Sequence, residues 1–431
     1  MSIYEYQQAF GAADKTSGAM RRAVEDWFGL YYGKAAPEED SCQRIAYTVV
    51  NKLVKTVFSE YKVTAEDPLL RKTLDGMEKM KNEAVQLALI GGECYIKPCP
   101  EKAGFSFTLI PRDRVLIFGR DARGVPVDIG TAEKSVLGQH YYTLLERRKV
   151  DEKGFLTMEN RLFRSYDPDQ LGQPVSLGEH PMYRGLWERY TYEKPVGSVG
   201  LVRMKTPMLN CVDGSADGVS VYAAAAGLIR NIDRNEFQLS GEFSRGESRI
   251  IASKDLLGKE GLTDHLFLGL DDDPEAVGIT VFSPQLREQS FLARKQEYLR
   301  NVESVIGLKR GLLSEVNAEQ RTATEVSSSQ GEHNLTVMDF QQMWELALRE
   351  GVRLTKALGT LYGLETAEDV RFTVDWGNGV LYDEEKLWKD YMAMVAAGLL
   401  KPELALAWRF NLPADTEAER LAIRQRFMPE A

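Results

Sequence analysis

The sequence lacks the patterns that would assign it a common enzyme chemistry. It contains no Gly-rich loop followed by Lys-Ser/Thr, so we do not expect ATP hydrolysis by a phosphate-loop mechanism. It has only four histidines and four cysteines in 431 residues, and no histidine stands at metal-ligand spacing from another histidine or from a cysteine. No nucleophile–base–acid arrangement stands out either. We therefore expect no enzyme activity, no cofactor and no bound metal.

The sequence also lacks membrane and secretion signals. No stretch approaches the roughly 18 consecutive apolar residues of a membrane helix. The first residues have neither the basic start nor the apolar core of a secretory signal. Cys42, Cys94, Cys99 and Cys211 do not form a disulfide framework, and Cys94 with Cys99 is either a pair of buried thiols or half of a metal site. These features predict synthesis in a reducing cytoplasm.

Positive charge is in deficit. The formal net charge is −10, whereas proteins that grip nucleic acid tightly usually carry a basic excess that neutralises phosphates. An apolar content of 43% with 27% charged residues is ordinary for a globular protein, so the acidity does not reflect disorder. The balance argues against static DNA binding but is compatible with a passage through which DNA slides.

The N-terminal half reads as helices followed by strands. Apolar stripes of helical period predict helices over 38–60 and 68–90. From Gly92 to about Val202 the period changes to two, which favours strands separated by Gly, Pro and Asp turns. The expected strands are near Tyr95, Phe105, Val115, Tyr141, Phe155 and Trp187.

Two amphipathic helices flank a small insert in the second half. The first is expected to start in the loop from Asp213 to Gly218 and to run to about Ser240, and the second runs from Pro284 to Gly307. Between them, short strands at Arg249 and Leu266 surround the acidic turn Asp271-Asp272-Asp273-Pro274. The helices fit either an intramolecular hairpin or a ring in which they pack on neighbouring copies. The acidic turn could hold a hard cation or simply be solvated.

A very long helix follows a Gly-bounded loop. Thr322 and Glu325 have capping-box spacing, and an apolar stripe behind them reaches Leu361 through Trp344. Such a helix spans roughly 40 residues, or about 60 Å. The C-terminal part is again helical, with Gly398 as a helix end, Pro402 as a helix start and a second capping box at Thr416 and Glu419.

Lys309 and Arg310 stand between Gly307 and Gly311 in the loop before the long helix. Glycines permit unusual backbone angles, so the loop is expected to turn sharply here. The two basic residues either line a nucleic-acid passage or interact with the negative end of the preceding helix dipole.

Four segments, in order, resemble tailed-bacteriophage portal proteins, the head-to-tail connectors, especially of phages of Gram-positive bacteria. Three are Asp213-Gly-Ser-Ala-Asp-Gly218, Phe243-Ser-Arg-Gly246 and Arg321-Thr-Ala-Thr-Glu-Val326. The last is Val370-Arg-Phe-Thr-Val-Asp375-Trp with its continuation through Asp383 to Gly398. Together they cover roughly the last half of the chain. The sequence departs from the commoner family pattern at Ser215-Ala-Asp217-Gly218 and at Trp376-Gly-Asn-Gly379.

The resemblance implies an α+β, portal-like fold. It places an α/β wing at 1–213, stem helix 1 at 214–241, a β-containing clip at 242–283 and stem helix 2 at 284–306. The rest of the fold would be a tunnel loop at 307–321, a long wing helix at 322–362 and a helical crown at 363–431. The residues facing a DNA channel would be Lys309, Arg310 and Arg321. The cap of the helix after the loop would be formed by Thr322 and Glu325. The clip docking surface would include Asp271, Asp272 and Asp273.

The same resemblance implies a function without catalysis. A ring of about twelve copies at one capsid vertex would pass double-stranded DNA during packaging and ejection. The terminase large subunit and later a head–tail adaptor would dock on the clip, and the ring would meet major capsid and scaffolding proteins. Assembly would take place in the bacterial host cytoplasm and the product would reside in the virion. The alternatives are another ring-forming adaptor or tail component, and a metal-dependent nucleic-acid-processing enzyme.

Overall fold

The computed structural model describes residues 3–101, 104–246, 249–253, 267–270, 279–282, 285–315, 323–377, 384–410, 412–414 and 416–428. The chain divides into two compact units. The first contains Met1–Val57 and Val63–Thr373, and the second contains Phe58–Lys62 and Val374–Ala431. Helices and sheets occur in separate runs along the chain, which confirms the expected α+β class.

Helices dominate the start of the first unit. They are α1 (Ile3–Phe10), α2 (Gly18–Tyr32), the short η1 (Glu39–Ser41), α3 (Ile45–Val57), α4 (Pro68–Glu78) and α5 (Lys81–Gly91). The helix predicted over 38–60 begins later, at Ile45, and the one predicted over 68–90 is two helices. The break between α4 and α5 lets α4 pack on strand β3 while α5 packs on β2.

Two antiparallel sheets follow. The first has the order β10-β2-β3, formed by β2 (Glu93–Glu101), β3 (Gly104–Pro111) and β10 (Val202–Lys205). After the short η2 (Arg112–Arg114), the second runs through β4 (Val115–Arg120), β5 (Pro126–Leu137), β6 (His140–Val150), β7 (Leu156–Ser165) and β8 (Gln173–Val175). Past η3 (Leu177–Glu179), strand β9 (Arg189–Thr191) also pairs with β7. Strand β5 was not predicted, and it pairs along its length with β6.

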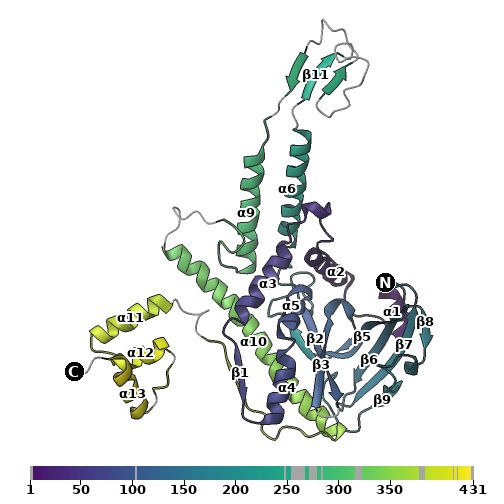
Figure 1. Ribbon diagram of the computed structural model, residues 1–431. Coiled ribbons are helices and arrows are strands. Elements are labelled where there is room, and N and C mark those ends of the chain that lie inside the picture. The colour runs from purple at the N-terminus through teal and green to yellow at the C-terminus, as the bar shows by residue number, and fades with distance from the viewer. Residues whose placement is uncertain are drawn as a thin grey trace. The chain divides into compact units, whose positions relative to one another are not determined.

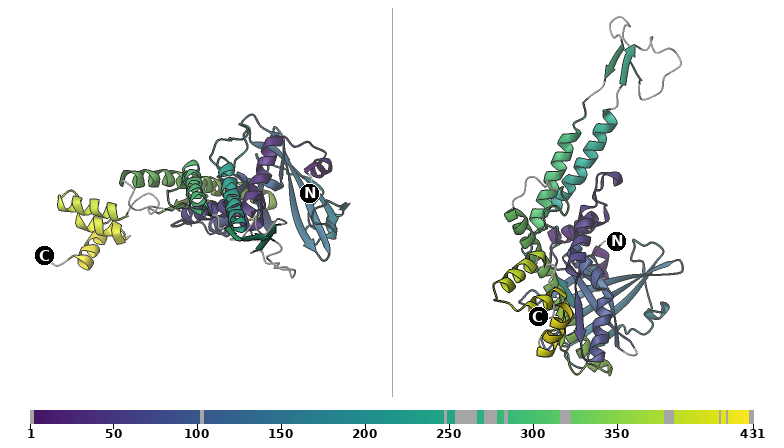
Figure 2. Two further views of the ribbon diagram at one scale, coloured as in Figure 1. Left: turned by 90° about the horizontal axis from the view of Figure 1, so that it is seen from above. Right: turned by 60° about the vertical axis from the view of Figure 1, so that its left-hand side comes forward.

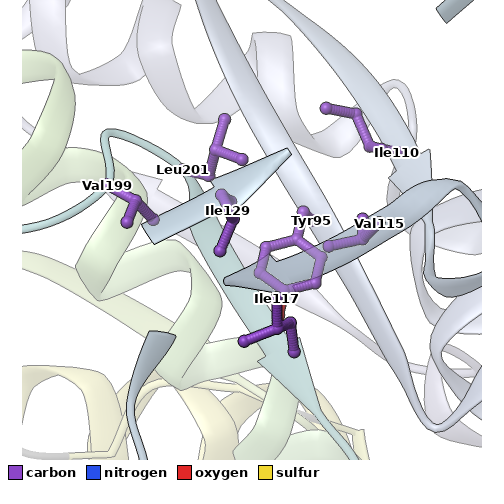
Figure 3. Close-up of a cluster of buried hydrophobic side chains, with 7 residues drawn as sticks. All are labelled: Tyr95, Ile110, Val115, Ile117, Ile129, Val199 and Leu201. Atoms are coloured by element: carbon purple, nitrogen blue, oxygen red, sulfur yellow. The ribbon is translucent and has the colours of Figure 1, made fainter. Parts of the chain in front are cut away.

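A buried hydrophobic cluster joins these two sheets. Its members are Tyr95, Ile110, Val115, Ile117, Ile129, Val199 and Leu201, drawn in Figure 3. They come from β2, β3, β4, β5 and the segment before β10, and each is at most 5% exposed. The cluster therefore packs the two sheets against each other.

A helical hairpin extends from this body. Helices α6 (Ala226–Arg245) and α9 (Glu288–Ile306) pack side by side (Figures 1 and 2). Between them the chain forms a three-stranded sheet of order β12-β11-β13, from β11 (Arg249–Ser253), β12 (Phe267–Leu270) and β13 (Ile279–Phe282). The Lys295–Glu236 ion pair measures 2.8 Å and the Arg287–Glu242 pair 2.7 Å. Lys295 lies on α9, Arg287 directly precedes α9, and both glutamates lie on α6, so the two ion pairs hold the hairpin in one register.

Helix α6 begins at Ala226, later than the predicted start in the loop at 213–218. The backbone groups that a helix would use are bonded elsewhere: the N–H of Gly218 donates to Glu93, and the N–H of Val221 donates to the carbonyl of Leu89. Helix α9 likewise starts at Glu288 rather than at 284. The prediction of stem helix 1 at 214–241 was wrong at its start because tertiary bonds override the local pattern.

The loop before α6 is held by a cluster of buried charges. The carboxylate of Glu93 accepts hydrogen bonds from Arg203, Tyr95 and the N–H of Gly218. Burial raises the pKa of Glu93, but the positive charges of Arg203 and Arg112 outweigh it and lower the pKa to about 2. Arg112, itself fully buried, lies 3.1 Å from the carboxylate of Asp217 in the same loop.

Glycine is required where this loop crosses the start of β2. A Cβ on Gly92, whose φ is +81°, would lie 2.4 Å from the backbone of Gly218, and a Cβ on Gly218 would lie 2.2 Å from the carbonyl oxygen of Gly92. The two backbones therefore approach each other more closely than any side chain permits. This crossing sets the path on which the chain enters α6.

Helix α10 (Ala323–Tyr362) is the longest element and packs on α3, α4, β2 and β10. The predicted apolar stripe is confirmed except at its end, where Leu361 is only partly buried: Val337, Phe340, Trp344, Ala347, Leu354 and Leu358 are buried. In the described part of the chain, no helix combines the length and the apolar character that crossing a membrane requires.

The second unit is built mainly of three helices, α11 (Glu384–Ala396), α12 (Pro402–Phe410) and α13 (Glu417–Phe427). The capping box predicted at Thr416 and Glu419 is confirmed, with both reciprocal hydrogen bonds present. Arg424 of α13 donates to Glu403 of α12 at 2.7 Å. Strands β1 (Lys62–Ala65) and β14 (Phe372–Asp375) pair with each other in a two-stranded sheet.

Replacing Trp344 tests the assignment of the α10 stripe. Its side chain is fully buried, so Trp344→Ala should lower the free energy of unfolding by about 3–5 kcal/mol. Leu346→Ala is the matched control, because Leu346 is 59% exposed on the same helix and should change stability little. Urea unfolding measures both, and equal effects of the two changes would contradict the stripe.

The Glu93 cluster predicts a dependence of stability on acid. Because its folded pKa of about 2 lies below the ordinary 4.5, ionised Glu93 stabilises the fold fully above pH 4.5, and this stabilisation is lost as the pH falls from 4.5 to 2. Glu93→Gln should cost about 3–5 kcal/mol at neutral pH and make the decline of stability below pH 4.5 shallower.

Glu146 shares the lowered pKa of about 2, so part of the acid dependence will remain in the Glu93 variant. Urea unfolding at a series of pH values measures the difference between the two proteins. Parallel stability curves for wild type and Glu93→Gln between pH 4.5 and 2 would refute the assigned role.

Candidate functional site

The candidate site is the turn that follows α9, residues 307–315. Helix α9 ends in a Schellman motif: the N–H of Leu308 donates to the carbonyl of Glu303, and the N–H of Gly307 donates to that of Ser304. Gly307 has a φ of +75°, the left-handed conformation that this helix ending requires. Leu308 is only 3% exposed, so the motif also anchors the chain hydrophobically.

Lys309 and Arg310 occupy the first two positions of a tight turn. The N–H of Leu312 donates to the carbonyl of Lys309 at 3.1 Å, and Gly311 at the third position has a φ of +88°. This combination is that of a type II turn, which needs glycine at that position. Both basic residues are exposed as a result, side by side at the tip of the turn.

A single buried carboxylate organises the far side of the turn. Glu303 of α9 is 0% exposed, and its Oε1 accepts hydrogen bonds from the N–H groups of Gly311, Leu313 and Ser314 at 3.1, 2.5 and 2.9 Å. Its Oε2 accepts from the hydroxyl of Ser314 at 2.7 Å. Four donors thus converge on one side chain, all from the residues that follow the basic pair.

Two neighbouring helices hold the same turn. Thr336 of α10 donates its hydroxyl to the carbonyl of Gly307 at 3.1 Å, and Lys52 of α3 donates to the carbonyl of Leu312. Burial first, and then the positive charge of Lys309, lower the pKa of the His333 imidazole on α10, while the carbonyl of Gly307 acts in the opposite direction. The lowered pKa favours the neutral imidazole.

The remaining predicted site residues are less fully described. Arg321, Thr322 and Asp271 to Asp273 lie outside the described residues. Helix α10 begins at Ala323, and Glu325 lies in its first turn, where only the backbone is described. The capping box at Thr322 stays a prediction. Within the described ranges, no group of three His, Cys, Asp or Glu residues is placed to hold a metal ion.

Sequence reasoning missed Glu303. It was not singled out from the sequence, yet it lies next to the buried Val302 in the last turn of α9. An acidic residue at that end of a helix opposes the helix dipole, so it needs compensating donors. The position of a glutamate in the last turn of a predicted helix was therefore the sequence feature that could have indicated a buried, hydrogen-bonded side chain.

Gly307→Ala tests the geometry of the turn. The added Cβ would lie 2.5 Å from the hydroxyl of Thr336, in a backbone conformation that L-residues avoid. We expect a loss of about 1–3 kcal/mol in unfolding free energy. Gly227→Ala inside α6 is the control, because its Cβ meets nothing within 4 Å and should raise stability by up to about 1 kcal/mol. Thermal unfolding compares them, and equal stability changes would contradict the described turn.

Comparison with known proteins relates the fold to particle necks. No protein-family model matches the sequence, and no curated protein matches it with significance. A chain of the structure described as "Neck of empty GTA particle computed with C6 symmetry" has 12% identity and a TM-score of 0.51, covering 95% of this chain and 98% of that chain. GTA denotes a gene transfer agent, a phage-like particle.

A second structure, "Neck of native GTA particle computed with C12 symmetry", has a TM-score of 0.47 at 12% identity, with coverage of 95% and 98%. The similarity to the first structure is the informative one. It shows that this chain shares its fold with a component of that neck over nearly the whole length of both chains.

Proposed function

We propose that this chain is a portal protein, a ring-forming head-to-tail connector of a tailed-phage or phage-like particle. The observation that carries the proposal is the fold shared with a neck component over 95% of this chain and 98% of that chain. The ordered motifs from Asp213 to Gly398 support it independently, because they rest on the sequence alone. In this proposal α6 and α9 form the stem, the β11–β13 sheet belongs to the clip, and α10 crosses the wing.

The surface of the hairpin supports packing between copies. Helix α6 presents exposed Arg234 and Arg245 together with Phe237, which is 38% exposed, while Glu297 of α9 is 62% exposed. In a closed ring, each subunit offers one lateral face to the opposite face of its neighbour. The exposed side chains on both helices leave these faces available for such a head-to-tail contact.

The 307–315 turn suits a channel through which DNA slides. Lys309 and Arg310 would repeat around the ring and form a band of positive charge within an acidic molecule. Contacts of exposed basic side chains with phosphates are screened by salt, carry no base information and are individually worth at most about 1 kcal/mol. They would centre double-stranded DNA without holding it. Arg321, which follows in the same loop, would add to this band.

The proposed partners follow from this position. DNA would enter and leave through the ring, the terminase large subunit and then the head–tail adaptor would dock on the clip, and capsid and scaffolding proteins would surround the wing. The clip residues Asp271 to Asp273 are proposed as part of that docking surface. Particle assembly would take place in the host cytoplasm, with the finished ring in the virion.

The double substitution Lys309→Ala with Arg310→Ala tests the channel role. Ring assembly, measured by native mass, should be unchanged because both side chains are exposed. The fraction of particles that package and retain DNA should fall, and the difference from wild type should shrink as the salt concentration rises, because salt screens the same contacts in the wild type.

Arg184→Ala with Arg189→Ala is the matched control. It removes two exposed basic residues, Arg184 in the loop before β9 and Arg189 at the start of β9, and should leave DNA content normal. Particles of ordinary composition and ordinary DNA content in the Lys309/Arg310 variant would show that the pair only ends a helix.

A further inference from the structure

The carboxylate of Glu303 lies against the turn that carries Lys309 and Arg310. It is fully buried, although it occupies the last turn of α9, where the helix dipole is unfavourable to negative charge. A buried carboxylate is costly unless donors surround it. Here three N–H groups and one hydroxyl, all from Gly311 to Ser314, supply that compensation.

The arrangement resembles an anion nest that is filled from within. Successive backbone N–H groups in a sharp turn commonly bind phosphate or another anion. In this turn the groups that could do so point at Glu303 instead. The N–H of Leu312 is bonded to Lys309, and that of Glu315 is bonded to Gln296 at 2.8 Å.

As a consequence, the side chains of this turn, and not its backbone N–H groups, are available to an external anion. The amides from Gly311 to Glu315 are all bonded within the protein, so an approaching phosphate meets the exposed side chains of Lys309 and Arg310. Backbone amides would hold a phosphate at a fixed geometry, whereas long basic side chains follow a moving one. This difference separates a binding site from a sliding surface.

We propose that Glu303 is a positioning residue that fixes the turn from Gly307 to Ser314 and keeps Lys309 and Arg310 projecting from it. The structural part of this inference stands on the hydrogen bonds alone. The part that concerns DNA rests on the proposed function, with the phosphate backbone as the ligand that the basic pair meets.

Hydrogen exchange tests the anchor in the purified protein without DNA. Glu303→Gln keeps the shape of the side chain but removes its charge, and Glu303→Ala removes both acceptors. In each variant, exchange at the amides of Gly311, Leu313 and Ser314 should accelerate about tenfold or more, because a bond to a charged acceptor is lost or weakened.

Glu297→Gln is the matched control for this measurement. It changes an exposed glutamate of the same helix that pairs only with Arg300 among the described contacts, and it should leave the three amides unchanged. Should Glu303→Ala fail to fold, the Gln variant still decides the question. Exchange at wild-type rates in Glu303→Gln would overturn the anchor.

A mutant cycle tests whether the anchor acts through the basic pair. DNA retention in particles is compared for Glu303→Gln, for Lys309→Ala with Arg310→Ala, and for the triple variant. If Glu303 acts by positioning the pair, its substitution lowers retention in the wild-type background and adds no further loss when the pair is absent. Independent, multiplying losses would overturn the positioning role.

The two experiments separate the inference from the proposed function. Normal DNA retention in the Lys309/Arg310 variant would reject the channel role and with it the DNA part of the inference. The exchange rates at Gly311, Leu313 and Ser314 would then still confirm or reject Glu303 as the anchor of the turn.

Discussion

The buried carboxylate of Glu93 holds together parts of the chain that are distant in sequence. It lies at the start of β2 and binds Arg203 of β10 and the N–H of Gly218 in the loop that leads to α6, with Arg112 bridging to Asp217. Breaking such a buried pair costs more than any one surface contact, because the partners are left charged and unpaired. The path of the chain into the α6–α9 hairpin (Figure 1) therefore depends on this cluster.

A second carboxylate repeats the same physical solution where the chain leaves the hairpin. Glu303 at the end of α9 is surrounded by donors from the following turn, as Glu93 is at the entry to α6. Both glutamates turn a glycine-containing loop into a defined structure by accepting its backbone N–H groups. The hairpin is thus fixed at both points where it joins the body of the first unit, through buried, hydrogen-bonded carboxylates.

The sequence predicted what depends on local pattern. The α10 stripe around Trp344 and the Thr416–Glu419 capping box follow from helical spacing, and Gly307 and Gly311 marked the turn that exposes Lys309 and Arg310. The start of α6 was misplaced because the N–H of Gly218 and that of Val221 are bonded to partners about 130 positions away, which no local pattern encodes. Glu303 was missed for a related reason: its charge suggested an exposed face, while the donors that allow its burial come from a turn whose path the sequence left open.

Electron microscopy of the purified protein tests the central claim, that this fold builds a ring around an axial passage. The account predicts closed rings of cyclic symmetry, with the α6–α9 hairpins gathered around a central hole and the turn that carries Lys309 and Arg310 facing it. Density for a monomer, or a ring whose hole is lined by the six-stranded sheet while that turn lies on the outer rim, would contradict it.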